Sequence, residues 1–250
     1  MAFVVVDYRK GNIRSVQKGL ELAGAQALIS EDAHAIAQAD AIVLPGVGSF
    51  ADAAAFMRAS GQLDAIRASI ARGVPFLGIC LGLHLLLERG EEGVPAPNSR
   101  EVPDASWAEG IGAISGYVRR LDSQTPDGRV LKVPHVGWNQ VRFTAEGCAE
   151  AVGMAGAPLA DRTASVPSVS RAALETLFAG IPDGANFYFT HSYQGVPVQQ
   201  GAVLATVTHA TTFPCVINTG VVFGVQFHPE KSSHNGLRVL RNFVGIVRNC

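Results

Sequence analysis

Short apolar runs alternate with amphipathic segments through the first half of the chain. Apolar residues in the amphipathic segments recur every three to four positions, as on one face of a helix. Predicted strands lie at Phe3–Val6, Ala27–Ile29, Ala41–Leu44 and Val74–Leu77, and predicted helices at Asn12–Ala23, Asp32–Ala39, Ala51–Met57 and Gln62–Ala71. This alternation predicts βαβ units, and therefore a three-layer α/β fold: an open, mostly parallel sheet with helices on both faces.

The second half of the chain is richer in strands and ends in a helix. The predicted strands lie at Ala113–Leu121, Val130–Val133, Asn139–Phe143, Asn186–His191, Val203–His209, Val216–Asn218 and Val221–Phe227, and the helix at Gly236–Val247. Segments at about 95–107 and 145–171 have little periodicity and are rich in small residues or proline, so we expect loop insertions there. We expect one domain over residues 1–250, a size that is ordinary for an α/β fold.

The sequence Gly78-Ile79-Cys80-Leu81-Gly82 follows an apolar strand and precedes a leucine-rich segment, Leu83–Leu87, that is predicted to be helical. Glycines on both sides of a cysteine are typical of a nucleophile elbow, in which a strained turn pushes one side chain into a pocket. A helix that begins at the sulfur favours the thiolate. The alternative is a buried structural cysteine between two incidental glycines.

Two more loops with candidate chemistry follow predicted strands. His228-Pro229-Glu230 places a carboxylate two residues after a histidine, so it could orient an imidazole that takes a proton from a thiol. Pro45-Gly46-Val47-Gly48 could offer backbone N–H groups to an oxyanion. Alone, the first could be an exposed turn and the second a plain connection. Because parallel strands end at one sheet edge, the three loops together favour cysteine-dependent acyl transfer.

Composition narrows the functional classes. A formal net charge of −1 argues against a broad basic face for nucleic acid. Four cysteines without a secretory leader predict a reducing, cytoplasmic location, and no run approaches the roughly 20 apolar residues that span a bilayer. No histidine pair has convincing metal spacing, and neither a Walker A loop nor a dinucleotide fingerprint is present. We therefore expect no metal, no cofactor and no membrane association.

The three motifs together resemble the class I (triad) glutamine amidotransferases. Further segments narrow the resemblance to the glutaminase subunits of imidazole glycerol phosphate synthase: the stretch from Asp7 to Val16, then Lys132–Asn139, Phe187–Tyr193 and Phe223–Ser233. These segments cover nearly the whole chain in the family's order. The resemblance implies the flavodoxin-like amidotransferase fold.

The resemblance also implies roles for individual residues. Cys80 would form a γ-glutamyl thioester, with His228 as acid and base and Glu230 orienting His228. Backbone N–H groups of the Gly46, Val47 and Gly48 loop, and of Leu81, would form the oxyanion hole. Glutamine itself would be held by the following residues: His84, Glu92, Ser192 and Tyr193.

One position departs from the family. Relatives usually have Met and then Gln after the elbow, and this Gln helps to hold the substrate; here the residues are Leu83 and His84. Since His84 is four residues after Cys80, a helix would place both on one face. His84 could replace Gln as a hydrogen-bonding group, or it could perturb the Cys80 thiolate and make glutamine binding depend on pH.

Glutamine hydrolysis alone would waste the amide nitrogen, so the resemblance implies a partner that uses ammonia. That partner would be a (β/α)8-barrel cyclase subunit similar to HisF, which forms a heterodimer and makes imidazole glycerol phosphate and AICAR in histidine biosynthesis. Four residues match the family's interface: Asn12, Trp138, Tyr188 and Lys231. Three alternatives stay open: a glutaminase subunit of another synthase, a stand-alone γ-glutamyl thiol hydrolase or peptidase, and a non-catalytic binding subunit.

Overall fold

The computed structural model describes residues 1–94, 107–144, 168–199 and 201–250. Within these residues a sheet of eight strands has the order β2-β1-β3-β4-β14-β13-β12-β9. Its strands are β1 (Ala2–Val6), β2 (Gln26–Ser30), β3 (Ala41–Gly46), β4 (Phe76–Cys80), β9 (Arg142–Phe143), β12 (Val203–Thr208), β13 (Thr212–Thr219) and β14 (Val222–Val225). Neighbours from β2 to β14 pair in parallel, whereas β14, β13, β12 and β9 pair antiparallel. The predicted α/β class is confirmed.

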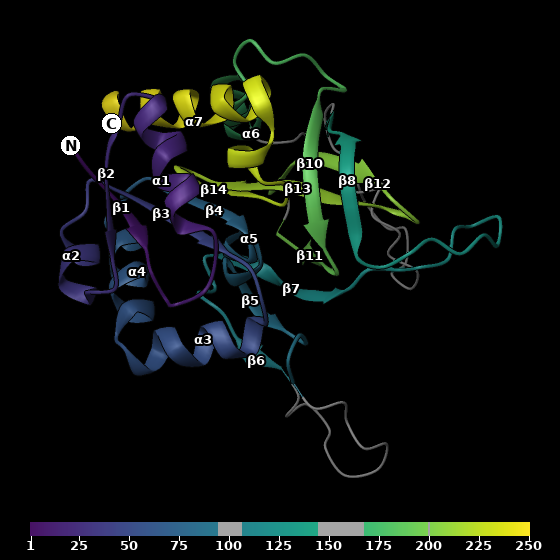
Figure 1. The fold of residues 1–250 in the computed structure, drawn as a ribbon, viewed down its shortest axis with the longest axis horizontal. Coiled ribbons are helices and arrows are strands. Elements are labelled where there is room, and N and C mark those ends of the chain that lie inside the picture. The colour runs from purple at the N-terminus through teal and green to yellow at the C-terminus, as the bar shows by residue number, and fades with distance from the viewer. Residues whose placement is uncertain (95–106, 145–167, 200) are drawn as a thin grey trace.

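Helices cover both faces of this sheet, as Figure 1 shows for α1 and α7 on one side and α2, α3 and α4 on the other. The helices are α1 (Ile13–Leu22), α2 (Ala33–Ala37), α3 (Phe50–Ala59), α4 (Gln62–Ala71), α5 (Leu81–Leu85), α6 (Ser168–Leu177), the 3-10 turn η1 (Pro229–Lys231) and α7 (Ser233–Arg248). Strand β1 explains the two layers, because successive side chains of a strand point to opposite faces. Phe3 and Val5 join one buried core with α1 and α7, while Val4 and Val6 join the other with α2, α3 and α4.

Two smaller sheets stand beside the large one. Strand β10 (Asn186–His191) pairs antiparallel with β8 (His135–Gln140). The other sheet has the order β11-β7-β5-β6, with β11 (Tyr193–Pro197), β7 (Ile114–Arg120), β5 (Leu87–Gly90) and β6 (Ala108–Glu109). Because β10 and β11 are separated by Ser192 alone, this single position joins the two smaller sheets.

Two sequence-based assignments of secondary structure were wrong in detail. The leucine-rich segment does not continue as a helix, since α5 ends at Leu85 and Leu87–Gly90 pairs with β7 instead. Val130–Val133 forms no strand; Val130 is 75% exposed and makes only an isolated bridge to Gln124. An apolar residue that packs against nothing has no reason to hold an extended ladder.

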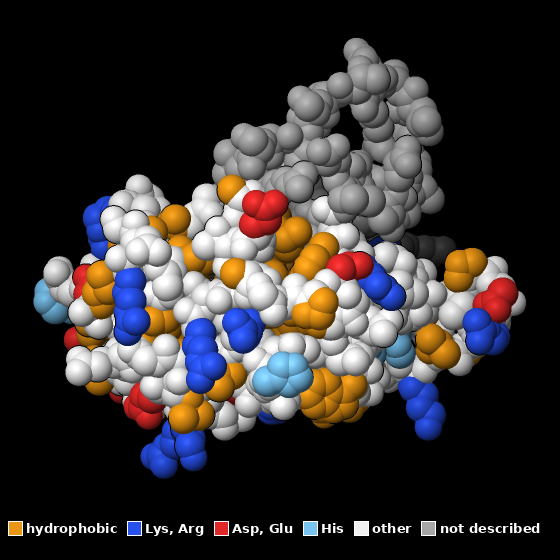
Figure 2. All heavy atoms as spheres, turned by 90° about the horizontal axis from the view of Figure 1, so that it is seen from above, with side chains coloured by type: hydrophobic (Ala, Val, Ile, Leu, Met, Phe, Trp, Pro, Cys, Tyr) orange, Lys and Arg blue, Asp and Glu red, His pale blue; other side chains and the backbone are white. Residues whose placement is uncertain are grey.

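Most of the two expected insertions, at about 95–107 and 145–171, lies outside the described residues. On the face of the molecule shown in Figure 2, Lys and Arg side chains are scattered among hydrophobic and uncharged ones and form no continuous patch. None of the helices in the described ranges is long and apolar enough to cross a membrane.

Candidate active site

Cys80 lies at the last position of β4 and directly before α5, with a backbone φ of 54°. A non-glycine residue in this region is strained, and such strain is characteristic of functional turns. The backbone on both sides of Cys80 packs so closely against its neighbours that only glycine fits there. A Cβ atom at Gly78 would lie 2.5 Å from the carbonyl oxygen of Gly82, and one at Gly82 would lie 1.9 Å from the carbonyl oxygen of Leu44. The predicted elbow is thus present in the backbone.

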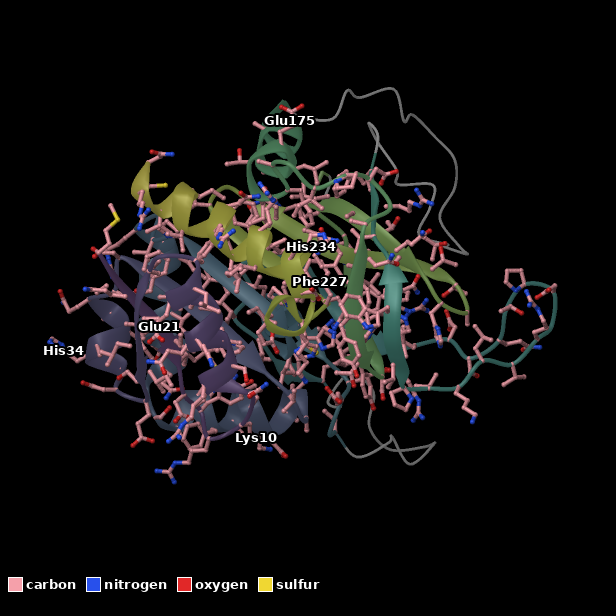
Figure 3. The ribbon with its side chains drawn as sticks, turned by 45° about the horizontal axis from the view of Figure 1, so that its top comes forward. Lys10, Glu21, His34, Glu175, Phe227 and His234 are labelled. Atoms are coloured by element: carbon pink, nitrogen blue, oxygen red, sulfur yellow. The ribbon has the colours of Figure 1, made fainter. Side chains whose placement is uncertain are left out.

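His228 and Glu230 form a buried hydrogen-bonded pair beside the elbow. They follow strand β14, which pairs with β4, so the end of β14 lies next to Cys80. In Figure 3, Phe227, the residue before His228, lies where the yellow segment leading into α7 meets β10. His228 Nδ1 lies 2.9 Å from Glu230 Oε1, and both side chains are almost fully buried.

The Nε2 atom of His228 is buried and has no partner of regular hydrogen-bond geometry. Cys80 is nevertheless close enough to act on it. Burial by itself lowers the pKa of His228, but hydrogen bonding and charge attraction from Cys80 and then Glu230 outweigh it and raise the pKa to about 9. An imidazole with this pKa is protonated at neutral pH and favours a thiolate beside it.

A pocket of about 270 Å³ opens at Cys80. Its wall contains eight of the residues expected from the sequence together with Pro134, Thr190 and His191; the eight are Val47, Gly48, Cys80, Leu81, His84, Glu92, Ser192 and Tyr193. These residues come from β4, α5, the loops after β3 and β5, and the junction of β10 and β11. The structure therefore gathers the candidate nucleophile, oxyanion and substrate residues around one cavity.

The candidate oxyanion loop begins at the end of β3, where Gly46 lies opposite Cys80 in the parallel register. A Cβ atom at Gly46 would overlap the hydroxyl of Tyr8, at 1.6 Å. That hydroxyl is buried without a hydrogen-bond partner, and burial, followed by the nearby Cys80 and Asp7, raises the pKa of Tyr8 above its usual range. The phenol thus fills the space under the loop, which explains why glycine is required there.

Glu92 also lines the pocket and contacts the first turn of α3. Its Oε2 accepts a hydrogen bond from the backbone N–H of Phe50 over 3.3 Å, and its carbonyl accepts one from Ala51 N. Partial burial raises the pKa of Glu92 to about 7, and the Phe50 hydrogen bond only reduces this effect. A carboxylate with no cationic partner among the described residues is suited to bind a ligand ammonium group.

His84 also reaches the pocket, but its Nε2 atom is already engaged. It lies 2.7 Å from Oε1 of Gln226, whose Nε2 donates to the sulfur of Cys80 over 3.6 Å. Burial lowers the pKa of His84 to about 4, despite hydrogen bonds to Gln226 and the Tyr193 backbone, so this imidazole is neutral at physiological pH. Sequence reasoning missed Gln226, which directly follows β14 and precedes His228 by two residues.

A second group of imidazoles braces the pocket wall. His191 Nδ1 lies 2.8 Å from the carbonyl of Tyr193, and its Nε2 lies 3.1 Å from His135 Nδ1, while Asn139 Nδ2 lies 3.2 Å from His135 Nε2. Burial lowers the pKa of His135 to about 4 and that of His191 well below its ordinary value. Because a carbonyl only accepts, the neutral rings must donate in one direction, from Asn139 through His135 and His191 to Tyr193.

Three of the four interface candidates gather on the β8–β10 sheet. Trp138 is 55% exposed, lies opposite Tyr188 in the register, and has its ring centre 6.1 Å from that of Tyr188. Lys231 Nζ lies 5.9 Å from the centre of the Tyr188 ring. The fourth candidate, Asn12, lies at the start of α1, where its Oδ1 accepts a hydrogen bond from Ser15.

No group of three or more His, Cys, Asp or Glu residues in the described ranges is arranged to hold a metal ion. Cys215 is fully buried and Cys250 is exposed near the C-terminus, and both are free thiols.

Comparison with known proteins agrees with this geometry. The family "Glutamine amidotransferase class-I" matches residues 4–246, and the chain belongs to it. Within that family the chain belongs with the HisH subunits of imidazole glycerol phosphate synthase. It is 41% identical to the subunit from Moorella thermoacetica over 98% of this chain and 95% of the relative, and 38% identical to that from Geobacillus thermodenitrificans over 97% and 95%.

Solved structures agree on the fold. The structure of PurLQS from Thermotoga maritima superposes with a TM-score of 0.63 at 16% identity, over 98% of each chain. A crystal structure of a glutamine amidotransferase gives a TM-score of 0.58 at 18% identity, also over 98% of each chain. At such identities these likenesses support the amidotransferase fold and nothing finer.

Proposed function

We propose that this chain is the glutaminase subunit of imidazole glycerol phosphate synthase, with Cys80, His228 and Glu230 as its catalytic triad. The observation that carries the proposal is the strained Cys80 in the wall of the pocket, next to an imidazole whose pKa is raised to about 9. A thiolate beside a protonated histidine is the form of a cysteine nucleophile that attacks a carbonyl carbon.

The reaction would proceed through a covalent intermediate. The Cys80 thiolate attacks the side-chain carboxamide carbon of glutamine, and His228 gives its proton to the departing nitrogen as the C–N bond breaks. Ammonia leaves, and a γ-glutamyl thioester remains on Cys80. His228 then takes a proton from water, whose oxygen attacks the thioester carbon and releases glutamate. Backbone N–H groups of Val47 and Leu81, both in the pocket wall, would stabilise the two oxyanions.

The released ammonia implies a synthase partner, which we propose to be a HisF-like (β/α)8 cyclase. The exposed Trp138 and the neighbouring Tyr188 would be its anchors, because large aromatic residues dominate the binding energy of many interfaces. Tyr188 also connects this face to the triad: its carbonyl accepts a hydrogen bond from the backbone N–H of His228 over 2.9 Å. A stand-alone hydrolase would not need such a surface. The cytoplasmic location stays a prediction.

Partner dependence is the test of this function. We expect glutamine hydrolysis by the purified chain to rise at least about a hundredfold when the barrel subunit and its ribonucleotide substrate are added. Their binding would favour the active conformation of the candidate oxyanion loop, and a ligand can shift such an equilibrium by several kcal/mol. The measurement is glutamate release with and without the partner. The matched control is Trp138→Ala, which should weaken the stimulation while leaving the unstimulated rate unchanged. Equal rates with and without the partner would instead support a stand-alone thiol hydrolase.

The raised pKa of Glu92 leads to a prediction of how glutamine binding depends on pH. We propose that its ionised form binds the α-ammonium group of the substrate. Because burial raises the pKa of Glu92 to about 7, the ionised fraction falls as the pH drops below that value. We expect KM for glutamine to rise about tenfold from pH 8 to pH 6, as follows from titration of a single group. Glu92→Gln should have a high KM that is nearly independent of pH. A wild-type KM that stays constant over this range would contradict the assignment.

A further inference from the structure

Two buried hydrogen bonds link Cys80 to a residue that differs from the family pattern. Gln226 donates through its Nε2 to the Cys80 sulfur over 3.6 Å, and its Oε1 lies 2.7 Å from Nε2 of His84. Gln226 is fully buried, and His84 and Cys80 are 3% and 5% exposed. Since water has little access to these groups, each of them depends on its protein partner.

The direction of both hydrogen bonds follows from the chemistry of the sulfur. A thiolate only accepts hydrogen bonds, and a thiol whose S–H donates to the Thr190 carbonyl over 3.9 Å can also only accept from Gln226, so in both forms the Gln226 amide presents its N–H group to Cys80. Its oxygen then faces His84. A neutral imidazole carries one N–H, for which the Gln226 oxygen and the Tyr193 backbone compete. The Tyr193 carbonyl already accepts a hydrogen bond from His191 Nδ1, so the His84 proton is placed on Nε2, where it satisfies the Gln226 oxygen. The other tautomer would place two acceptors together, and the amide would be driven to turn its oxygen toward the sulfur.

We propose that His84 is a positioning residue for the nucleophile: its Nε2–H holds the Gln226 side chain in the orientation that donates to the Cys80 thiolate. The proposal rests on the glutaminase function above, and it assigns His84 a role through Gln226 rather than through the substrate. A glutamine at position 84 could act in the same way, because its side-chain Nε2 occupies nearly the place of an imidazole Nε2.

Other titratable groups lie near these residues. Their influence on the reactivity of Cys80 must be distinguished from that of the Gln226 hydrogen bond. His228 and Tyr8 interact with Cys80, Glu230 is bound to His228, and His191 lies near His84. A substitution of His84 that keeps the neutral charge leaves all of these in place. A change in thiolate reactivity would therefore report the hydrogen bond from Gln226.

The experiment measures how fast iodoacetamide alkylates Cys80 in the full chain between pH 5 and 9. The reaction is followed on the Cys80 peptide by mass spectrometry, because the exposed Cys250 also reacts. The variants are His84→Asn, which removes the donor at Nε2, His84→Gln, which keeps one there, and Gln226→Met. The control is His34→Asn on α2, an exposed histidine at the edge of the molecule and away from Phe227 (Figure 3).

We expect His84→Asn and Gln226→Met to slow alkylation at pH 7 about tenfold and to move its pH midpoint up by about one unit, the scale of one hydrogen bond to a charged group. The double variant should be no slower than either single one. His84→Gln and His34→Asn should stay within about twofold of wild type. Slow alkylation in Gln226→Met with a normal His84→Asn would overturn the proposal, as would normal rates in both.

A second measurement covers the case in which His84→Asn fails to fold. Nitrogen NMR of the wild-type chain, with labelled histidine, reports which ring nitrogen of His84 carries the proton. We expect Nε2–H; an Nδ1–H tautomer would refute the role. Neither measurement uses glutamine turnover, so a failure of the glutaminase assay and a failure of this proposal remain distinguishable.

Discussion

Cys80→Ala and His228→Ala are each expected to lower kcat for glutamine hydrolysis in the partner-bound state by at least about 10⁴-fold. The alanine at position 80 removes the atom that forms the thioester, so the covalent route is closed. The alanine at position 228 removes the imidazole that protonates the departing ammonia and whose raised pKa, about 9, favours the thiolate. Because the two residues act as one unit, the double variant should be no slower than the single ones.

The measurement is glutamate release at saturating glutamine and partner. Cys250→Ala is the matched control, since it removes an exposed thiol near the end of the chain and should leave kcat unchanged. If Cys80→Ala kept more than about a hundredth of the wild-type rate, the covalent mechanism would be wrong. A double variant much slower than both single variants would show that Cys80 and His228 contribute independently.

Gly82→Ala is expected to cost about 3 kcal/mol of folding stability or more, and most of the glutaminase activity. Its Cβ atom would lie 1.9 Å from the carbonyl oxygen of Leu44, so the clash is with backbone and no side chain can move to relieve it. Leu44 lies in β3, which ends in the candidate oxyanion loop, and Gly82 lies in α5, which begins after Cys80. Separating these elements would move the oxyanion donors away from the nucleophile.

Chemical denaturation and kcat measure the two effects. Gly245→Ala is the matched control: Gly245 lies within α7, and a Cβ atom there would have no heavy atom within 4 Å. That variant should be neutral or up to about 1 kcal/mol more stable, because alanine favours the helix. A Gly82→Ala protein as stable as Gly245→Ala would show that β3 and α5 can separate freely.

Much of the fold could be predicted because its central strands are continuous apolar runs. Residues 41–44, 76–79 and 222–225 are buried on both faces, which makes them recognisable without a periodic pattern. The same property hides the end of the helix after the elbow. Leu83–Leu87 is apolar throughout, and an apolar run does not reveal where a helix ends and a strand begins. Only pairing between β5 and β7 decides that boundary.

The candidate site could be predicted as far as local motifs extend. The elbow and the His-Pro-Glu segment each carry their signal within a few residues, and the wall of the pocket contains the residues proposed for substrate binding. The partner of His84 could not be found in this way, since Gln226 lies 142 positions further along the chain. The same holds for His135 and His191, which are 56 positions apart. Contacts at such separations depend on the packed structure.

The ordered imidazoles behind Tyr193 give this protein a chemical weakness of its own. Each neutral ring carries one N–H group, so a second proton on either ring would place two N–H donors against each other. The pKa values of His135 and His191 are lowered in the folded protein. As the pH falls through about 6.5, these histidines therefore become protonated in the unfolded chain but stay neutral in the native protein. The free energy of unfolding that these two histidines contribute therefore decreases as the pH falls below that value. The loss of stability falls on the segment that shapes the pocket at Cys80, and it comes from imidazoles rather than from the carboxylates that usually govern unfolding in acid.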